Sequence, residues 1–336
     1  MPYDLDFEKP LAELEKRIGN LQKRGDRLKP DEQVQLQNTE RELRQRTEEL
    51  YKHLNSWQTV LVARHKNRPY ALDYLKLMCG DFFELHGDRR FGDDHAIVAG
   101  PATLDGQTVM FICHQKGRDS KEMQFRNLGM PHPEGYRKAY RMMEQAQKFG
   151  LPVVTLIDTS GAFPGLEDEE RGQAESIAAN LYLMSRLHVP IVGVVIGEGG
   201  SGGALAISIV DRLLMMEHSI YTVASPETAA TIMWRDASFA PQAAEAMRIS
   251  ARELKNFDLI DDLVPEPLGG AHRDHQGAAN NLKDALCQQI ADLKRIPLDE
   301  LLEQRYQKFR RIGKYGVAEP AIAGVADSHE AQQPAK

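Results

Sequence analysis

Residues 190–217 read PIVGVVIGEGGSGGALAISIVDRLLMME, and this stretch decides the fold of the chain. It opens with an apolar, β-branched run, Ile191 to Ile196, which predicts a strand buried on both faces. Five glycines follow within seven residues: Gly197, Gly199, Gly200, Gly202 and Gly203. Glycine is favoured where the main chain takes a positive φ or closely approaches another group. Residues 204–210 are small and apolar and predict a short helix, whose first amides could hold an anion or an oxyanion.

A similar arrangement precedes this stretch. Residues 151–157 form another apolar run, and DTSGAFPG follows at 158–165, before a helix predicted from Glu167 to about Leu187. The chain thus alternates strand, glycine-rich turn and helix twice, which is typical of parallel βαβ units. Both turns should then lie at the carboxyl ends of the strands, where their main-chain amides can converge. An oxyanion or anion site is the function that this pattern favours.

The glycine-rich turn has other interpretations. Gly197, Gly199 and Gly202 fit a dinucleotide-binding fingerprint, with Glu217 at the distance of a ribose-binding acid. The segment before the next apolar run is too short for the usual crossover helix, which weighs against that motif. A tight turn without a ligand is also possible, although it would need only one or two glycines.

Side chains near the two turns offer few alternatives. Ser160 and Ser201 lie in the turns, so a serine nucleophile has to be weighed. His114, His188 and His218 lie in or beside apolar segments and are interpreted as hydrogen-bonded structural residues rather than bases. We therefore expect main-chain amides to provide the chemistry.

The composition excludes several classes of protein. The chain has 336 residues, is 42% hydrophobic and 27% charged, and carries a net charge of −7, which disfavours a general binder of DNA or RNA. No apolar run reaches transmembrane length and the N-terminus lacks the apolar core of a signal peptide, so no membrane partner is expected. Its three scattered cysteines predict a cytoplasmic protein without a metal site of its own.

Three regions follow from these patterns. Residues 1–57 predict a helical hairpin whose apolar seam is formed by Leu11, Leu14, Ile18 and Leu21 in the first helix and by Leu36, Leu43 and Leu50 in the second. So narrow a seam should pack on the main domain or on a partner. Residues 58–316 form that main α/β domain, and residues 317–336 lack periodicity and are expected to be disordered. The charged segment HGDRR at 86–90 is interpreted as a surface loop, with a phosphorylated ligand as the alternative.

Five motifs resemble one family in order and in spacing. They are HQKGRD at 114–119, RNLGMPHPEGYRKA at 126–139, DTSGAFPGLEDEERGQ at 158–173, IGEGGSGGALAI at 196–207 and LIDDLVPEPLGGAHR at 259–273. Together with RPYALDY at 68–74 and the hairpin, they are similar to the alpha subunits of bacterial acetyl-CoA carboxylase carboxyltransferase, from about residue 5 to 316. Ser160 departs from the family, in which many members have proline there. This difference changes the stiffness of the turn and leaves its amides in place.

The resemblance implies a fold, a reaction and partners. The fold would be a crotonase-like ββα spiral within an α₂β₂ heterotetramer, with a zinc ribbon on the partner beta subunit. Carboxybiotin on a biotin carboxyl carrier protein, charged by biotin carboxylase, would give its carboxyl group to acetyl-CoA. The product would be malonyl-CoA, in the first committed step of fatty-acid synthesis.

The resemblance also implies roles for individual residues. The oxyanion hole would be formed by Gly161 and Ala162 after one strand and by Gly202 and Gly203 after the next, and it would hold the ureido oxygen of biotin. The cofactor would lie against Gly199, Gly200, Gly165 and Phe163. Replacing Gly202 by valine should then inactivate the folded protein, because a side chain would block the approach and disfavour a positive φ.

Two other functions remain to be distinguished. A self-sufficient crotonase-like hydratase or decarboxylase would need a carboxylate near the second turn, and Glu227 is the only candidate close by in the sequence. A non-catalytic scaffold could bind a partner through the hairpin, but it would have no use for five clustered glycines. An assay of the purified chain with and without a zinc-bearing partner separates these possibilities.

Overall fold

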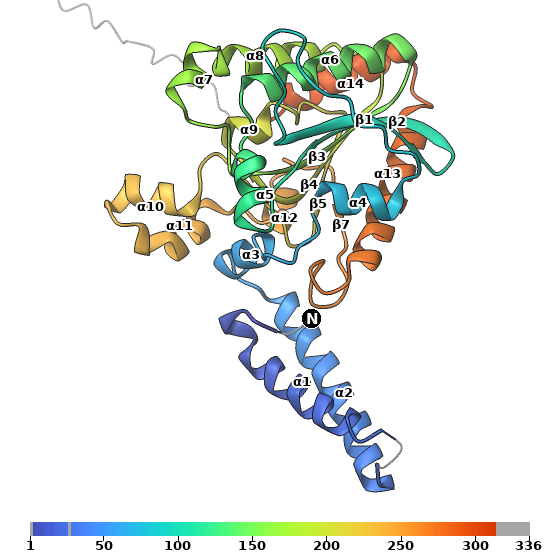
Figure 1. Cartoon of the computed structure of the whole chain (residues 1–336), viewed down its shortest axis with the longest axis vertical. Coiled ribbons are helices and arrows are strands. Elements are labelled where there is room, and N and C mark those ends of the chain that lie inside the picture. Colours follow the sequence, from blue (N-terminus) through green and yellow to red (C-terminus); the bar gives the residue numbers. More distant parts are fainter. Residues whose placement is uncertain (1–2, 26–27, 314–336) are drawn as a thin grey trace, which may run out of the picture.

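A computed structural model describes residues 3–25 and 28–313, and within them one mixed sheet organises the chain (Figure 1). The strand order is β1-β2-β3-β4-β5-β7, and β6 pairs with the end of β4. The strands are β1 Ile97–Leu104, β2 Gln107–His114, β3 Val153–Thr159, β4 Ile191–Gly200, β5 Arg212–Met216, β6 Ile220–Thr222 and β7 Asp262–Val264. From β2 onward each named pair is parallel, as the alternation of strand, turn and helix predicted.

A β-hairpin opens the sheet. β1 and β2 pair antiparallel up to Leu104 and Gln107, which leaves Asp105 and Gly106 as a two-residue turn. Both turn residues have positive φ, at 49° and 77°. This is the conformation that an Asp-Gly pair favours in tight hairpins, because its twist matches that of the strands.

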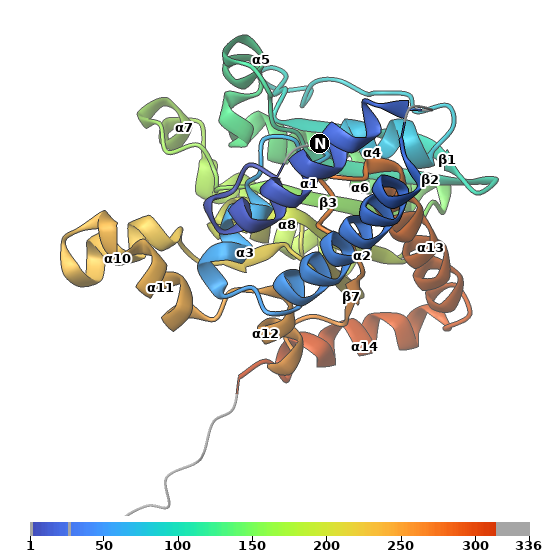
Figure 2. The same ribbon diagram turned by 90° about the horizontal axis from the view of Figure 1, so that it is seen from below.

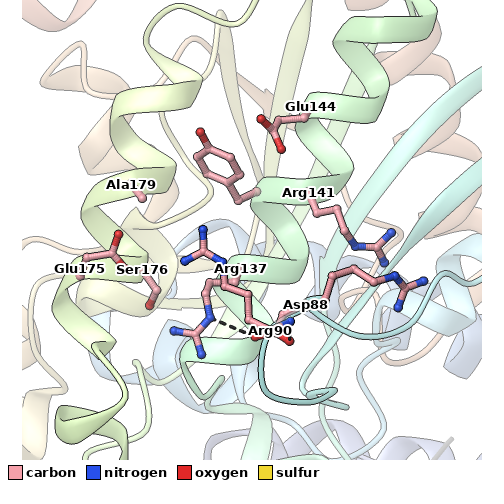
Figure 3. A pocket seen from close by; sticks show the side chains of 10 residues that line it. Asp88, Arg90, Arg137, Arg141, Glu144, Glu175, Ser176 and Ala179 are labelled. Carbon is pink, nitrogen blue, oxygen red and sulfur yellow. Dashed lines mark hydrogen bonds and ion pairs between the residues drawn. The ribbon is translucent and has the colours of Figure 1, made fainter.

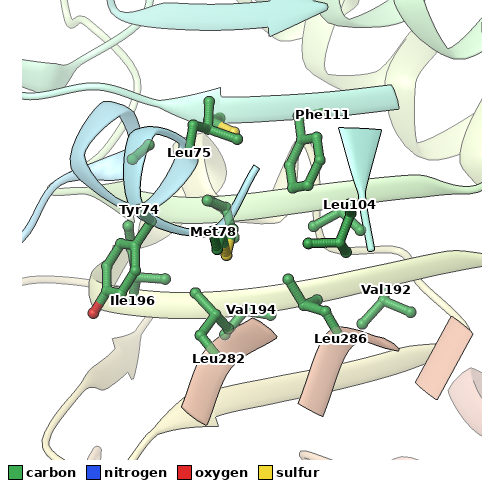
Figure 4. Packing of buried hydrophobic residues seen from close by; sticks show 14 of the residues in the cluster. Tyr74, Leu75, Met78, Leu104, Phe111, Val192, Val194, Ile196, Leu282 and Leu286 are labelled. Carbon is green, nitrogen blue, oxygen red and sulfur yellow. The ribbon is translucent and has the colours of Figure 1, made fainter. Parts of the chain in front are cut away.

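Helices cover both faces of the sheet, and alternate residues of the central strands supply both cores. Val192, Val194 and Ile196 of β4 pack with α4 (Ala71–Met78) and α13 (His275–Leu293), where Leu282 and Leu286 meet the sheet (Figure 4). Ile191 and Val195 point to the opposite face, where α6 (Pro133–Phe149) and α8 (Gln173–Met184) pack. Burial on both faces explains why β4 is apolar throughout rather than alternating.

Two expectations about the glycine-rich segments were wrong. β4 does not end at Ile196 but continues through Gly200, and the following helix, α9, spans only Ser201–Leu205. The helix predicted from Glu167 to about Leu187 is two helices, α7 (Leu166–Glu170) and α8, because Gly172 takes a left-handed φ of 85° between them. Such a residue interrupts the helical hydrogen-bond ladder.

The N-terminal helices α1 (Lys9–Gln22) and α2 (Pro30–Lys52) project from the sheet (Figures 1 and 2). Leu11, Leu14 and Ile18 of α1 are buried, in agreement with the predicted seam. The predicted seam of α2 was incomplete: Leu36, Leu43 and Leu50 are half-buried, while the fully buried residues are Thr39, Thr47 and Tyr51, which the prediction did not include. The threonines can face α1 because their hydroxyls bond back to carbonyls in the preceding turn, at 2.8 Å in each case.

The base of this hairpin contacts the sheet region. Arg273 lies 2.8 Å from Glu15 and stacks on the ring of Tyr3, and Arg252 donates to the Lys52 carbonyl. The remaining helices are α3 Ser56–Ala63, α5 Ser120–Phe125, α10 Pro226–Trp234, α11 Ala240–Met247, α12 Ala251–Asn256 and α14 Leu298–Arg310. The tail expected at 317–336 lies outside the described residues.

Candidate active site

The two glycine-rich segments meet at the carboxyl edge of β3 and β4. A Cβ atom on Gly203 would lie 2.6 Å from the Ala162 nitrogen, and one on Gly200 would lie 2.5 Å from the Ser160 carbonyl carbon. Neither position has room for any side chain, because backbone atoms cannot move aside. The structure therefore brings the expected pairs, Gly161 with Ala162 and Gly202 with Gly203, to one place.

The main-chain amides at this place are not equivalent. The Gly161 amide donates to the Thr159 hydroxyl at 3.1 Å, so it is already engaged. The amides of Ala162, Gly202 and Gly203 have no hydrogen-bond partner in the part of the chain that the structure describes. These three amides remain available as donors to a ligand, whereas Gly161 contributes only by packing against Gly203.

The reason expected for Gly202 was wrong. The positive φ of this turn falls on Ser201, at 52°, and Gly202 has none. A Cβ atom on Gly202 would meet only Ile177 Cδ1, at 3.7 Å, which is an ordinary contact. The sequence could not reveal which residue of Gly-Ser-Gly takes the strained conformation, because glycine neighbours permit it anywhere.

The other expected residues have packing roles. Gly199 lies under the ring of Tyr221, 2.7 Å from a would-be Cβ, while Gly165 packs against the Asp168 carboxylate. Phe163 lines a cavity of about 460 Å³ beside α5, and its amide donates to the Pro131 carbonyl at 3.0 Å. Contact between these residues and a cofactor stays a prediction.

A bulge in β4 sets the position of the glycine turn. β3 and β4 are in register up to Ile157 and Val195, but the next pair is Thr159 with Gly199, so β4 has two extra residues. Asp158 bridges this gap, since its carboxylate accepts the Glu198 amide at 2.9 Å. The carboxylate fits because residue 197 is glycine, where a Cβ would lie 2.7 Å from it.

A second charged side chain, that of Arg68, forms a hydrogen bond with the main chain of the bulge. Arg68 is 1% exposed, and its Nε donates to the Ile196 carbonyl at 2.7 Å. Its guanidinium pairs with the buried Glu266, at 3.0 Å for the longer of two hydrogen bonds. Burial would raise the pKa of Glu266, but the Arg68 charge and hydrogen bonds outweigh it and lower the pKa to about 2. The pair thus stays charged inside the protein and satisfies main chain that the sheet leaves unpaired.

Lys116 extends this network toward the surface. Its ammonium lies 2.7 Å from Asp158 and 3.7 Å from Glu198. Although burial works against its charge, these two carboxylates raise the pKa of Lys116 above its usual value. Glu198 also pairs with Arg64 at 2.6 Å, and Arg64 holds Glu227 at 2.7 Å. Asp158, Glu198 and Glu227 thus each contact a cation, and the three carboxylates share the two positive charges of Lys116 and Arg64.

Beside Gly202 lies an apolar cavity of about 390 Å³. Ser201, Gly202 and Leu205 form one wall, while Tyr221 and Leu213 belong to the strands. The polar atoms that line this cavity near the turn are main-chain atoms and the Ser201 hydroxyl. This hydroxyl has no hydrogen bond within the described residues. The cavity can accept a largely apolar ring that carries one polar oxygen toward the amides.

Beside Phe163, a histidine and a carboxylate form a fixed pair. The Nδ1 atom of His132 bonds to Asp168, which also takes Arg171 at 3.2 Å. The His132 amide donates to Asp94 at 2.7 Å, and the ring lies 4.5 Å from that of Phe163. His132 also lines the cavity of about 460 Å³, and its Nε2 makes no hydrogen bond within the described residues.

The histidines considered from the sequence take no part in this pair. His188 is exposed, and burial lowers the pKa of His218 below its usual value. His114 is fully buried beside the main chain of Gly203, and burial lowers its pKa to about 3. Its ring nitrogens have no hydrogen-bond partner within residues 3–25 and 28–313, so the expectation that it is hydrogen-bonded was wrong.

Comparison with known proteins identifies the family. Residues 4–313 match the family described as acetyl co-enzyme A carboxylase carboxyltransferase-like. An acetyl-coenzyme A carboxylase carboxyl transferase subunit alpha from Geobacter metallireducens is 53% identical over 314 residues, which are 93% of this chain and 98% of that protein. The corresponding subunit of Geobacter sulfurreducens is 59% identical over 268 residues, 80% of this chain and 84% of its own length.

The chain belongs to this family. Solved structures agree in fold with the family assignment. Transcarboxylase 12S, with methylmalonyl-coenzyme A and methylmalonic acid bound, has a TM-score of 0.52 at 20% identity over 67% of this chain. The match covers 44% of the transcarboxylase chain, so this chain spans less than half of it. A Pseudomonas malonate decarboxylase hetero-tetramer has a TM-score of 0.51 at 20% identity, over 64% of this chain and 86% of its own. The fold is the crotonase-like carboxyltransferase fold that the motifs implied.

Several charged residues around the two glycine-rich turns could not be identified from sequence. Asp158 and Lys116 lie within quoted motifs, but nothing marks them as partners across 42 positions. Arg68 and Glu266 are separated by 198 positions, and both belong to segments that resemble loops. The available signal was chemical: charged residues directly before or after buried strands need partners.

The described residues offer neither a membrane span nor a metal site. No helix there is long and apolar enough to span a membrane. No group of three or more histidine, cysteine, aspartate or glutamate side chains there could hold a metal ion.

Proposed function

We propose that the amides of Ala162, Gly202 and Gly203 form the oxyanion hole of the carboxyl transfer that characterises this family. In this proposal the chain takes carboxybiotin from a carrier protein and acetyl-CoA as acceptor, and the product is malonyl-CoA. The observation that carries it is the contact of Gly203 with the Gly161–Ala162 peptide, which excludes any side chain. Preorganised amides of this kind stabilise negative charge on oxygen as it develops.

The residues of this chain perform binding and positioning. The three amides donate to the ureido oxygen, and the apolar cavity of about 390 Å³ beside Gly202 receives the ring and excludes water. Asp158 and Arg68 hold the bulge that keeps the two loops in contact. When bound, carboxybiotin supplies the carboxyl group and a nitrogen that can take up the proton of the acetyl methyl group, so no side-chain base is required.

The cavity fits such a group by shape and polarity. The biotin ring system is compact and fuses an apolar thiolane ring to a polar ureido ring, so the thiolane would lie against the apolar wall and the ureido oxygen would face the free amides. Glu198 and Glu227 both form ion pairs with Arg64, which supports transfer over the hydratase or decarboxylase alternative, because that alternative needs a carboxylate free to exchange a proton. The scaffold alternative gives no reason for the side-chain-free contact at Gly203.

The partners proposed for this chain are a zinc-ribbon beta subunit in an α₂β₂ assembly, biotin carboxyl carrier protein and biotin carboxylase, in the cytoplasm. Exposed apolar side chains on the projecting α10 region support a partner there (Figure 1): Val223, Ile232, Met233, Trp234 and Phe239. Such contiguous exposure marks interaction surfaces. Packing of the hairpin on a partner or neighbour stays a prediction, to be checked by assembly of a chain lacking residues 1–55.

Reconstitution tests the proposed function. The full chain is assayed alone and with its beta subunit, carboxylated carrier protein and acetyl-CoA, and malonyl-CoA is measured. We expect product only with both subunits, and a rate for Ser201→Ala within about fivefold of wild type, since its hydroxyl is not a nucleophile. Loss of four or more decades in Ser201→Ala, or an acyl-serine adduct in the quenched enzyme, would establish serine chemistry instead.

A further inference from the structure

A cavity of about 440 Å³ lies away from the glycine turns, between α6, α8 and the loop at 86–92. Four arginines line it: Arg89 and Arg90 from the loop, and Arg137 and Arg141 from α6. Figure 3 shows the loop crossing beside the two helices, with Ser176 and Ala179 of α8 on the opposite wall. This is the segment whose alternative interpretation was contact with a phosphorylated ligand.

The positive charge of this cavity is only partly compensated. Arg137 is paired with Asp88 at 3.0 Å and with Glu134 at 2.8 Å. Arg89, Arg90 and Arg141 have no carboxylate within ion-pair distance among the described residues. Arg89 and Arg141 donate only to main-chain carbonyls of the loop, at 3.0 Å and 3.1 Å.

The electrostatic surroundings of Arg141 also favour a bound anion. Burial and the neighbouring Arg89 guanidinium both lower the pKa of Arg141 below its usual value. Its charge is therefore held where solvent and protein compensate it poorly, and a bound anion would offset both effects.

The loop is fixed in a conformation that presents these arginines. The buried Asp88 carboxylate accepts the amides of Arg90, Phe91 and Gly92 at 2.8–3.0 Å while it holds Arg137. Asp93 accepts the Gly87 amide at 2.8 Å and pairs with the fully buried Lys138 at 2.6 Å. Arg89 itself takes a left-handed φ of 64°. A loop held by two carboxylates loses little entropy when its side chains bind a ligand.

We propose that this arginine cavity binds the phosphoryl group of a small phosphorylated ligand. Guanidinium groups recognise phosphate through paired hydrogen bonds and remain charged at every physiological pH. Glu144 and Glu175 also line the cavity and make no ion pair within the described residues. Their charge disfavours an extended polyanion such as a nucleic acid and limits the ligand to one or two phosphoryl groups.

The test is calorimetric titration of the full chain with inorganic pyrophosphate at low ionic strength. Wild type should bind saturably, and Arg90→Ser and Arg141→Met should each weaken binding at least tenfold. Arg295→Ser is the matched control, because Arg295 is an exposed arginine of the C-terminal half whose side chain pairs with Asp292 at 3.3 Å, away from the cavity lining, and it should bind as wild type does. The Arg90 side chain makes no hydrogen bond within the described residues, so Arg90→Ser should keep its fold, as checked by its urea unfolding midpoint.

Titrations with coenzyme A, dephospho-coenzyme A and inorganic phosphate identify the source of the phosphoryl group. Binding of coenzyme A but not of the dephospho form, with the same dependence on Arg90, would assign the site to the 3′-phosphate of coenzyme A. Binding of pyrophosphate or phosphate without coenzyme A would assign it to a separate phosphorylated ligand. The proposal is overturned if none of the four compounds binds saturably up to millimolar concentration, or if Arg90→Ser and Arg141→Met bind as wild type does.

Discussion

The N-terminal hairpin and the carboxyl edge of the sheet both depend on charged residues, but they use them in opposite ways. In the hairpin, Glu42 and Arg46 pair at 2.6 Å with side chains 42% and 56% exposed. At the sheet edge, Arg68 and Glu266 pair with exposures of only 1% and 0%. The hairpin has many charges in solvent, whereas the edge has a few charges inside the protein.

The difference shows that the density of charge along a sequence does not indicate where charge determines structure. Exposed pairs are screened by water and fix two flexible side chains, so most contribute less than about 1 kcal/mol. A buried pair gains little over an apolar replacement, but loss of one partner leaves an uncompensated charge. The sparse charges around β4 therefore control the position of the glycine turn, and the dense charges of the hairpin mainly keep it soluble.

The largest effect is expected from breaking the buried pair. Arg68→Met should lower the free energy of unfolding by about 3–5 kcal/mol, because it leaves Glu266 charged and unpaired and removes the donor to the Ile196 carbonyl. Urea denaturation of the full chain measures the change. The double variant Arg68→Met with Glu266→Gln should recover part of the loss, and a single variant within 1 kcal/mol of wild type would contradict the role assigned to this pair.

Next in size is the difference between two adjacent glycines. In the reconstituted enzyme, Gly203→Ala should lower kcat by about 10²–10³-fold, since its methyl group would collide with the Ala162 amide and displace one donor of the hole. Gly202→Ala is the matched control and should stay within about fivefold of wild type, because its methyl group meets only Ile177. Equal losses in the two variants would show that the close contact at Gly203 is not what shapes the hole.

The buried Arg68–Glu266 pair and the turn at Gly202 and Gly203 also show where prediction from sequence ends. The apolar runs and the two glycine-rich turns are local signals, and they correctly predicted parallel strands and the edge of the sheet where the turns meet. The extension of β4 through Gly200 could not be predicted, because it depends on Asp158 and Arg68 satisfying the bulge from distant parts of the chain. Likewise, Leu36 and Leu43 recur at a spacing of seven, but nothing in that pattern indicates that Thr39 and Thr47 are the more deeply buried residues of α2.

A smaller effect is expected from pH. The pKa of His114 is about 3 in the folded chain, well below the value of about 6.5 expected after unfolding. Between these values the unfolded chain binds a proton that the folded chain does not, so this residue reduces stability as pH falls below about 6.5. His114→Leu should therefore gain up to about 1.4 kcal/mol relative to wild type for each pH unit below that value. Urea denaturation at pH 7.5, 6 and 5 measures the difference, and parallel curves for the two proteins would place the His114 pKa near its usual value.

The smallest effect returns to the hairpin. Glu42 precedes Arg46 by one helical turn, an arrangement that contributes about 0.3–0.5 kcal/mol in an exposed helix. Glu42→Ala and Arg46→Ala, alone and combined, form a double-mutant cycle whose coupling energy should lie in that range and decrease at 1 M salt, where the screening length is about 3 Å. A coupling energy above about 1.5 kcal/mol would mean that this pair is shielded from water in solution.

Because both side chains are exposed in the isolated chain, that result would indicate that a partner or a second copy covers the hairpin. A small, salt-sensitive coupling in the isolated chain that rises when the beta subunit is added would instead locate the hairpin at the subunit interface.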